Sequence, residues 1–120
     1  MNVLVVDDSP AMRMMIMRTA KKAGLGKHKF EQASDGAEAF EKILDNRPDL
    51  ILSDWNMPNM TGIELLEKLK EEKIRIKFGF VTTEGTAEMR LRARKAGALF
   101  LIVKPFTVES FEQALWRALD

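Results

Sequence analysis

Short apolar runs alternate along the chain with longer segments in which apolar side chains recur at helical spacing. Residues 3–6 form a run typical of a strand buried on both faces, and residues 12–23 then place their apolar side chains on one helical face. Ser9 before Pro10, and Thr61 three residues before Glu64, are typical helix-capping pairs. The repeated alternation predicts strands over 3–6, 30–33, 50–52, 78–82 and 99–103, each followed by a helix.

This order of elements indicates the fold class. Strands that are apolar throughout, rather than at every second position, are typical of a parallel sheet with helices on both faces. We therefore expect an α/β, flavodoxin-like, doubly wound (βα)5 fold with the strand order 2-1-3-4-5. No repeat, low-complexity tract or linker interrupts the pattern, so we expect one domain over residues 1–120.

Composition and charge exclude several classes of protein. Nineteen basic and eighteen acidic residues give a net charge of +1, which does not indicate a nucleic-acid or membrane partner. The absence of cysteine excludes disulfides and thiolate metal sites, and a single histidine excludes a multi-histidine site. The chain has no long apolar run and no leader, so we expect a soluble, cytoplasmic protein. We also expect it to be a monomer.

The polar residues that end the predicted strands indicate where chemistry occurs. Asp7 and Asp8 follow the first strand, Asp54 the third, Thr82 ends the fourth, and Lys104 follows the fifth. Ligands of such sheets bind at the carboxyl ends of the strands, where the strand order reverses. If the first and third strands flank this point, three carboxylates meet there, with a hydroxyl and an ammonium group nearby.

Three carboxylates in one crevice need compensation. Two unit charges about 4 Å apart repel by roughly 4 kcal/mol at an effective dielectric of about 20, and the single Lys104 cannot neutralise all three. Either the pKa of one aspartate is raised or a divalent cation is bound, and oxygen-only ligands favour Mg²⁺. We favour the metal, and with it a phosphoryl site. Asp54, which stands alone at its strand end, is then the candidate nucleophile, and Asp7 and Asp8 suit the cation.

These residues, with the 54–62 segment DWNMPNMTG and the 104–106 segment KPF, resemble the receiver domain of two-component response regulators, in particular its single-domain chemotaxis type. The resemblance covers essentially the whole chain. It implies that Asp54 accepts phosphate from a sensor histidine kinase, that Lys104 pairs with the phosphoryl group, and that Thr82 moves toward it. The Mg²⁺ ligands that it implies are Asp8, Asp54, the backbone carbonyl of Asn56, and Asp7 through a water.

The resemblance also implies a cis Lys104–Pro105 peptide and an unidentified protein target, bound on the face formed by the helix over 86–96, the strand over 99–103 and the last helix.

Leu101 departs from the family pattern, because an aromatic residue is usual there. Strand alternation directs the neighbouring Phe100 to the other side of the sheet. We expect Trp55 to be a partly exposed loop residue.

Two other functions fit the same residues. An aspartate-nucleophile phosphatase would need a further protonatable group near the leaving group, and Asn56 occupies the obvious position for it. A designed or chimeric scaffold could keep the frame without signalling. We favour the phosphoryl-accepting switch over a conventional enzyme.

Overall fold

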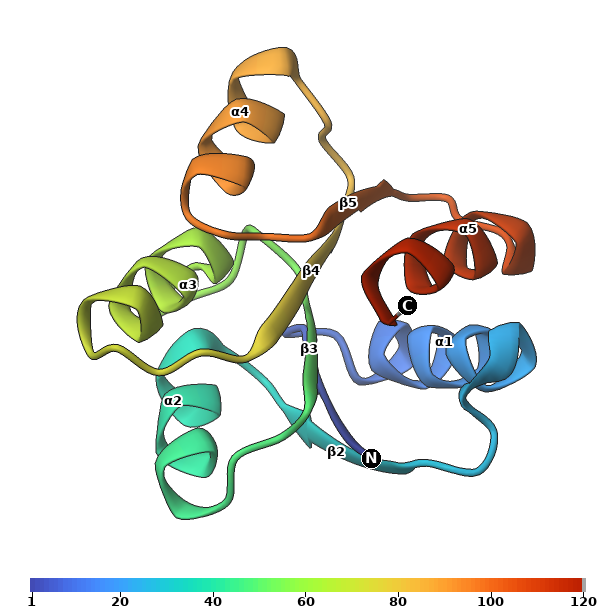
Figure 1. Ribbon diagram of the computed structural model, residues 1–120, viewed down its shortest axis with the longest axis horizontal. Coiled ribbons are helices and arrows are strands. Elements are labelled where there is room, and N and C mark those ends of the chain that lie inside the picture. The colour runs from blue at the N-terminus through green and yellow to red at the C-terminus, as the bar shows by residue number, and fades with distance from the viewer. Residues whose placement is uncertain (120) are drawn as a thin grey trace.

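The computed structural model describes residues 1–119 and contains one parallel sheet of five strands. Their order is β2-β1-β3-β4-β5, with every neighbouring pair parallel, which confirms the predicted order 2-1-3-4-5. The sheet stands edge-on at the centre of Figure 1. The strands are β1 (Asn2–Val6), β2 (Lys29–Ala33), β3 (Leu50–Ser53), β4 (Lys77–Thr82) and β5 (Phe100–Val103).

Helices cover both faces of the sheet. They form two groups, one on each face of the sheet, as Figure 1 shows. The first group is α1 (Pro10–Ala20) and α5 (Val108–Leu119); the second is α2 (Gly36–Asp45), α3 (Gly62–Glu71) and α4 (Ala87–Lys95). A π-helical turn, η1 (Lys21–Leu25), extends α1, and Gly24 within it adopts a φ of 125°, which ends the helix at low cost.

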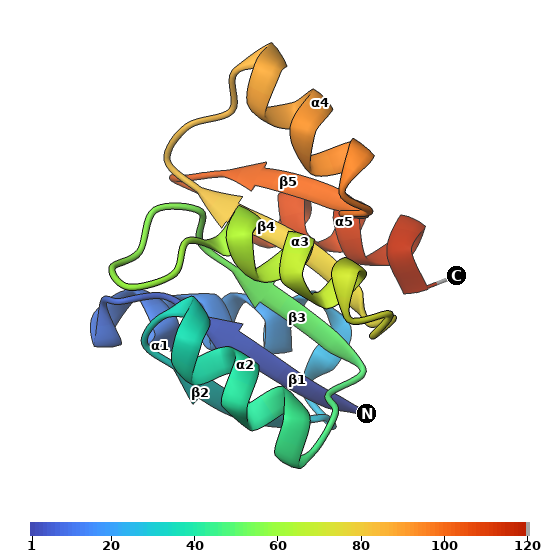
Figure 2. The same cartoon turned by 90° about the vertical axis from the view of Figure 1, so that its left-hand side faces the viewer.

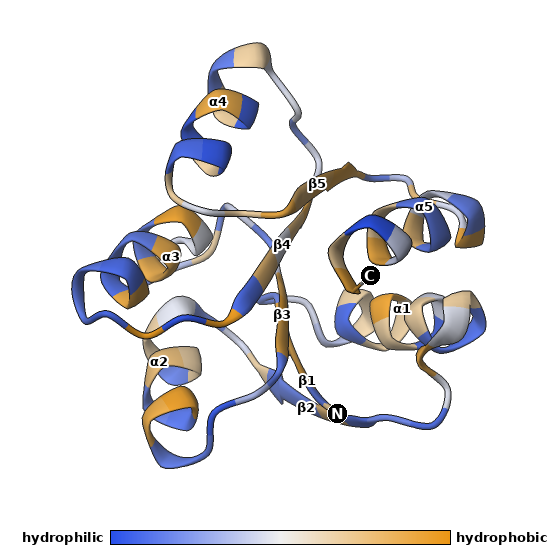
Figure 3. Cartoon of the chain, in the orientation of Figure 1, coloured by the Kyte–Doolittle hydropathy of each residue, from blue (hydrophilic) through white to orange (hydrophobic). Residues whose placement is uncertain are grey.

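The core consists of two hydrophobic layers, one on each face of the sheet. Within β1, Leu4 and Val6 face the layer under α2, α3 and α4, whereas Val3 and Val5 face the layer under α1 and α5. Hydrophobic segments of the helices turn toward the sheet and hydrophilic ones turn away (Figure 3). Burial on both faces is the reason why the strand sequences are apolar at consecutive positions.

The helix caps predicted from the sequence are present. The Ser9 side chain accepts a hydrogen bond from the backbone N–H of Met12, and Thr61 forms a reciprocal capping box with Glu64. All strands point toward one edge of the sheet, where the connections to the following helices lie (Figure 2). None of the helices described over residues 1–119 is long and apolar enough to cross a membrane.

Candidate phosphoryl and metal site

Three carboxylates predicted to meet do meet at the carboxyl edge of the sheet. Asp7, Asp8 and Asp54 each place an oxygen within 4.8 Å of the others. β1 and β3 are direct neighbours with Val6 opposite Ser53, so the residues that follow them lie side by side. Asp7 and Asp54 are buried, whereas Asp8 is exposed.

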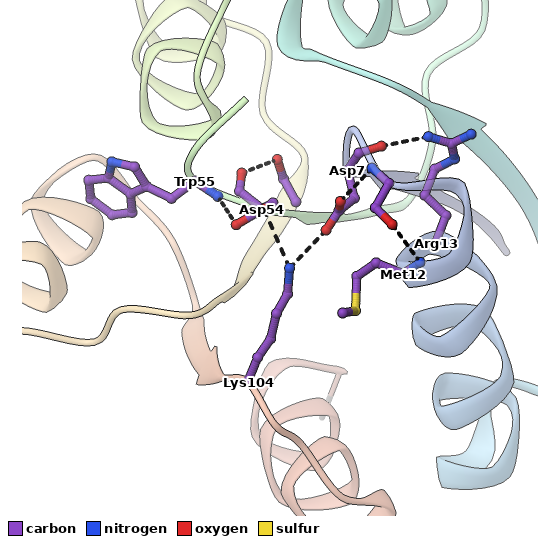
Figure 4. Close-up of polar contacts among 8 residues, drawn as sticks. Asp7, Met12, Arg13, Asp54, Trp55 and Lys104 are labelled. Atoms are coloured by element: carbon purple, nitrogen blue, oxygen red, sulfur yellow. Dashed lines mark hydrogen bonds and ion pairs between the residues drawn. The ribbon is translucent and has the colours of Figure 1, made fainter. Parts of the chain in front are cut away.

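Lys104 is the cation of this cluster and forms ion pairs with two carboxylates. Its Nζ lies 2.9 Å from Asp7 Oδ2 and 3.4 Å from Asp54 Oδ2, and its side chain is only 9 % exposed. In Figure 4 the lysine reaches from beyond β5 to a point between the two carboxylates. The Lys104–Pro105 peptide is cis, as the resemblance implied.

Backbone groups fix the two buried carboxylates. The N–H of Trp55 donates to Asp54 Oδ1 at 2.7 Å, and the N–H of Ser9 donates to Asp7 Oδ1 at 2.9 Å. Arg13 donates to the carbonyl oxygen of Asp7 at 2.6 Å and thereby ties the first turn of α1 to the end of β1. The side-chain oxygens of Asp7 and Asp54 that point to Lys104 therefore keep a defined orientation.

Burial raises the pKa of Asp54 above its ordinary value of 3.8, and repulsion from Asp7 adds to this shift. Lys104 and the N–H of Trp55 favour the charged form and act in the opposite direction. The upward direction of the pKa means that Lys104 and the N–H of Trp55 do not fully offset the burial of Asp54 and its repulsion from Asp7. Additional positive charge at this edge would stabilise the ionised cluster.

Thr82 ends β4 beside this cluster. Its hydroxyl oxygen is fully buried and has no hydrogen-bond partner among the described residues. The hydroxyl slightly favours the charged form of Asp54, but the two groups are outside hydrogen-bond geometry. A buried hydroxyl without a partner costs free energy, and an acceptor oxygen added next to Asp54 would remove that cost.

The donor set fits a hard divalent cation. All three acidic residues supply oxygen, and carboxylate oxygens with water are the ligands that Mg²⁺ prefers. Asn56, whose carbonyl oxygen is the remaining predicted ligand, lies exposed on the loop two residues after Asp54. Its role as a ligand stays a prediction.

The start of α3 is packed directly against the end of β3. The N–H of Gly62 donates to the carbonyl oxygen of Trp55 at 2.8 Å. A Cβ atom at position 62 would lie 2.0 Å from the carbonyl oxygen of Asp54, a distance that no side chain tolerates. Glycine is therefore required here for the close approach of helix and strand.

The expectation that Trp55 is partly exposed is wrong. Trp55 is 8 % exposed, and its ring stacks on Phe80 with a centroid separation of 4.8 Å. Only its backbone N–H faces Asp54, while the indole points away from the carboxylates into the layer under α3 and α4 (Figure 4). The sequence did not show this because the direction of the indole depends on its tertiary contact with Phe80.

The strand β5 confirms the predicted alternation. Leu101 packs against the layer under α2, α3 and α4, and Phe100 packs against the opposite layer. A contact that sequence reasoning missed lies nearby: Arg90 donates to the carbonyl oxygens of Gly85 at 3.2 Å and of Leu101 at 3.5 Å. It joins the loop after β4 to β5, and no signal in the sequence distinguishes it from the other arginines of α4.

A five-stranded doubly wound sheet with three carboxylates, a lysine and a threonine at its carboxyl edge defines a class of α/β domain with a candidate phosphoryl site. A family model described as the response regulator receiver domain matches residues 3–116. The chain belongs to the response regulator receiver domain family.

Curated relatives and solved structures agree with this assignment. The chain is 40% identical over 118 residues to the chemotaxis protein CheY1 of Helicobacter pylori, covering 96% of this chain and 94% of the relative. It is 39% identical to a CheY homolog of Campylobacter jejuni, covering 96% and 89%. The structure of the chemotaxis protein CheY4 of Vibrio cholerae superposes with a TM-score of 0.84 at 36% identity, covering 98% and 97% of the two chains.

Proposed function

We propose that this chain is a phosphoryl-accepting signalling switch in which Asp54 takes a phosphoryl group from the phosphohistidine of a sensor kinase. The observation that supports it best is the convergence of three carboxylate oxygens within 4.8 Å of one another, beside Lys104 and a buried, unpartnered hydroxyl. In this step the phosphorus–nitrogen bond breaks while a phosphorus–oxygen bond to Asp54 forms. The carboxylate attacks in its charged form, so Asp54 has no proton to lose.

Each residue of the site has a role in this proposal. Lys104 pairs with the transferred group, and the Thr82 hydroxyl donates to one of its oxygens, which gives the buried hydroxyl the acceptor it lacks. Asp8, Asp54 and the carbonyl of Asn56, with Asp7 through a water, would hold Mg²⁺, and the bound ion would supply charge neutralisation for the phosphoryl oxygens.

The phosphatase alternative has less support. Hydrolysis of a phosphoester needs a group that protonates the leaving oxygen. Asn56 is an amide and cannot serve, and the single histidine, His28, lies in the loop before β2, where its ring bonds the N-terminal amine. A phosphoryl-accepting switch needs no such proton donor, because its phosphodonor does not leave as an alkoxide.

Output of the proposed switch would occur by binding a protein target on the face formed by α4, β5 and α5. This face contains a groove of about 490 Å³ lined by Arg90, Arg94 and Arg117 among other residues. Its arginines favour a target with acidic side chains. Because the relatives are chemotaxis proteins by name, we propose a chemotaxis or similar two-component pathway, with the chain acting as one cytoplasmic receiver domain.

The test is the intact mass of the protein after incubation with acetyl phosphate and Mg²⁺. We expect one phosphoryl adduct on the wild type and none on Asp54→Asn. No adduct on the wild type, or an unchanged adduct on the variant, would show that the acceptor is assigned wrongly. Repeated turnover of a panel of phosphomonoesters would favour the phosphatase instead.

Target binding is tested by comparing the beryllofluoride-bound and free forms in a pull-down. We expect the bound form to retain a protein that the free form does not, and Arg94→Gln with Arg117→Gln to weaken that retention. Equal retention by both forms would mean that the site at Asp54 does not control this face.

A further inference from the structure

A second groove lies at the amino edge of the sheet, opposite to the carboxylate cluster. It has a volume of about 770 Å³ and lies between the end of α3, the start of β4 and the turn after α4. Its floor is apolar: Leu66, Leu69 and Ile74 are buried beneath it, and Leu99 beside them is 49 % exposed. The size is that of a cleft that receives a ligand or several side chains of a partner.

The segment from residue 73 to residue 77 forms one wall of this groove and has the sequence KIRIK. Basic and apolar residues alternate along it, which is visible between α3 and β4 in Figure 3. Ile74 is buried and Ile76 half-buried, whereas Lys73, Arg75 and Lys77 are exposed. The alternation places apolar side chains toward the floor and positive charges on the rim.

The charge of the groove differs from that of the chain. Among the residues that the structure describes, its lining contains the four cations Lys70, Lys73, Arg75 and Lys77 and no carboxylate, although the whole chain has a net charge of only +1. Lys70 donates to the carbonyl oxygen of Lys95 at 3.0 Å. Within residues 1–119 the other three cations form no ion pair. They are available to anionic groups of a partner.

Lys73 has a backbone conformation that is costly for a lysine. Its φ is 59°, the left-handed region that glycine enters at lower cost. The position follows the end of α3, where glycine is the usual residue. The chain thus keeps a positive side chain on the rim of the groove at a position where glycine would suit the backbone better.

We propose that this groove is a docking site for an acidic amphipathic segment of a partner protein. Leucine-like side chains of the partner would enter the apolar floor, and its carboxylates would pair with Lys73, Arg75 and Lys77. An anionic membrane fits less well, because the buried part of the apolar surface lies recessed below the cations and cannot insert between lipids. The inference goes beyond the proposed switch and does not depend on phosphorylation of Asp54.

The test uses the full chain and a defined probe. The probe is a fluorescent peptide of about 15 residues, long enough to form a helix, with leucine at helical spacing on one face and glutamate on the flanking positions. A peptide of the same composition in scrambled order is the control. We expect saturable anisotropy with the amphipathic peptide only, and chemical-shift changes of the ¹⁵N-labelled protein centred on Ile74, Ile76 and Gly97.

Paired variants test the role of the rim. Lys73→Gly combined with Lys77→Gln should weaken binding about two- to thirtyfold, from roughly 0.2–1 kcal/mol for each of the two exposed ion pairs lost. Lys27→Gln combined with Lys29→Gln removes two exposed charges near the start of β2 and should leave affinity unchanged. Thermal melting checks the fold, and glycine at position 73 relieves backbone cost rather than adding it.

Four results would overturn the proposal. The first two are equal binding of the scrambled peptide and an equal loss of peptide affinity in both pairs of variants. The third is chemical-shift changes centred on the groove between α4 and α5. The fourth is binding of the protein to phosphatidylglycerol vesicles without binding to the peptide. Asp54→Asn should bind the peptide as the wild type does. A failure of this site is therefore distinguishable from a failure of the phosphoryl switch.

Discussion

Replacing the candidate phosphoacceptor by its neutral isostere should stabilise the metal-free protein. Asp54→Asn removes a charge from a residue that is 9 % exposed while keeping an oxygen that can accept from the N–H of Trp55. The pKa of Asp54 is raised, first by burial. A carboxyl group whose pKa is higher in the folded than in the unfolded state is destabilising in its charged form.

The magnitude follows from the distances. Lys104 at 3.4 Å from Asp54 attracts it by about 5 kcal/mol at an effective dielectric of about 20. Asp7, taken at the limiting distance of 4.8 Å, repels it by about 3.5 kcal/mol, and the exposed Asp8, screened by water, adds about 1 kcal/mol. These contributions nearly cancel. Desolvation of the buried carboxylate costs several kcal/mol. The hydrogen bond from the N–H of Trp55 offsets about 1.5–3 kcal/mol of this cost, so the charged form of Asp54 destabilises the folded protein by about 1–2 kcal/mol.

The assay is thermal unfolding in buffer with a chelator at pH 7. For a chain of this length, 1–2 kcal/mol raises the midpoint by about 4–8 °C. The gain should be absent below pH 3.8, where the carboxyl is protonated in both states, and should appear as the pH rises through the raised pKa of folded Asp54. Millimolar Mg²⁺ should stabilise the wild type more than the variant.

Glu41→Gln is the matched control, because Glu41 is an exposed carboxylate in the middle of α2. Its effect should stay within about 0.5 kcal/mol. An Asp54→Asn protein that melts at or below the wild-type temperature, or a gain that does not depend on pH, would refute the charge argument.

Three further predictions concern residues at or near the site. Asp8→Ala should raise the melting temperature in metal-free buffer, and the gain in the free energy of unfolding should be about 1 kcal/mol at most because Asp8 is exposed. It should also weaken the stabilisation by Mg²⁺. An unchanged or lower midpoint would argue against repulsion among the carboxylates. The fluorescence of Trp55 should change with millimolar Mg²⁺, since its N–H bonds Asp54; emission that reports unfolding but ignores Mg²⁺ would favour a scaffold without a metal site. Gly79→Ala should lower the free energy of unfolding, measured with denaturant, by about 1–3 kcal/mol, because the added Cβ would lie 2.1 Å from the ring of Phe100. An unchanged free energy would mean that the ring moves aside freely.

The strand order and the helix positions could be predicted because they rest on repeating local patterns. Consecutive apolar residues in β1 and β3 required burial on both faces, and Ser9 and Thr61 marked helix starts by their own hydrogen bonds. The strand β2 alternates exposed and half-buried residues, with only Ala33 fully covered. Patterns of this kind did not predict the π-helical turn after α1, which contacts α5, far along the chain.

The convergence of Asp7, Asp8, Asp54 and Lys104 was predictable once the sheet order was assumed, because parallel strands end at one edge. The direction of the Trp55 side chain was not, because it depends on the packing of Phe80 against the loop after β3. The contact from Arg90 to Gly85 was equally hidden, since it depends on how closely the loop after β4 approaches β5.

The close packing at Gly62 has a mechanical consequence. The first residue of α3 packs directly on the carbonyl of Asp54, because no Cβ lies between them. No flexible side chain at this contact can adjust when either backbone moves. Any displacement of the main chain at position 54, by even a few tenths of an ångström, must therefore be absorbed by moving α3 as a rigid rod or by breaking the bond from Gly62 to Trp55. Position 62 thus couples the end of β3 directly to the start of α3.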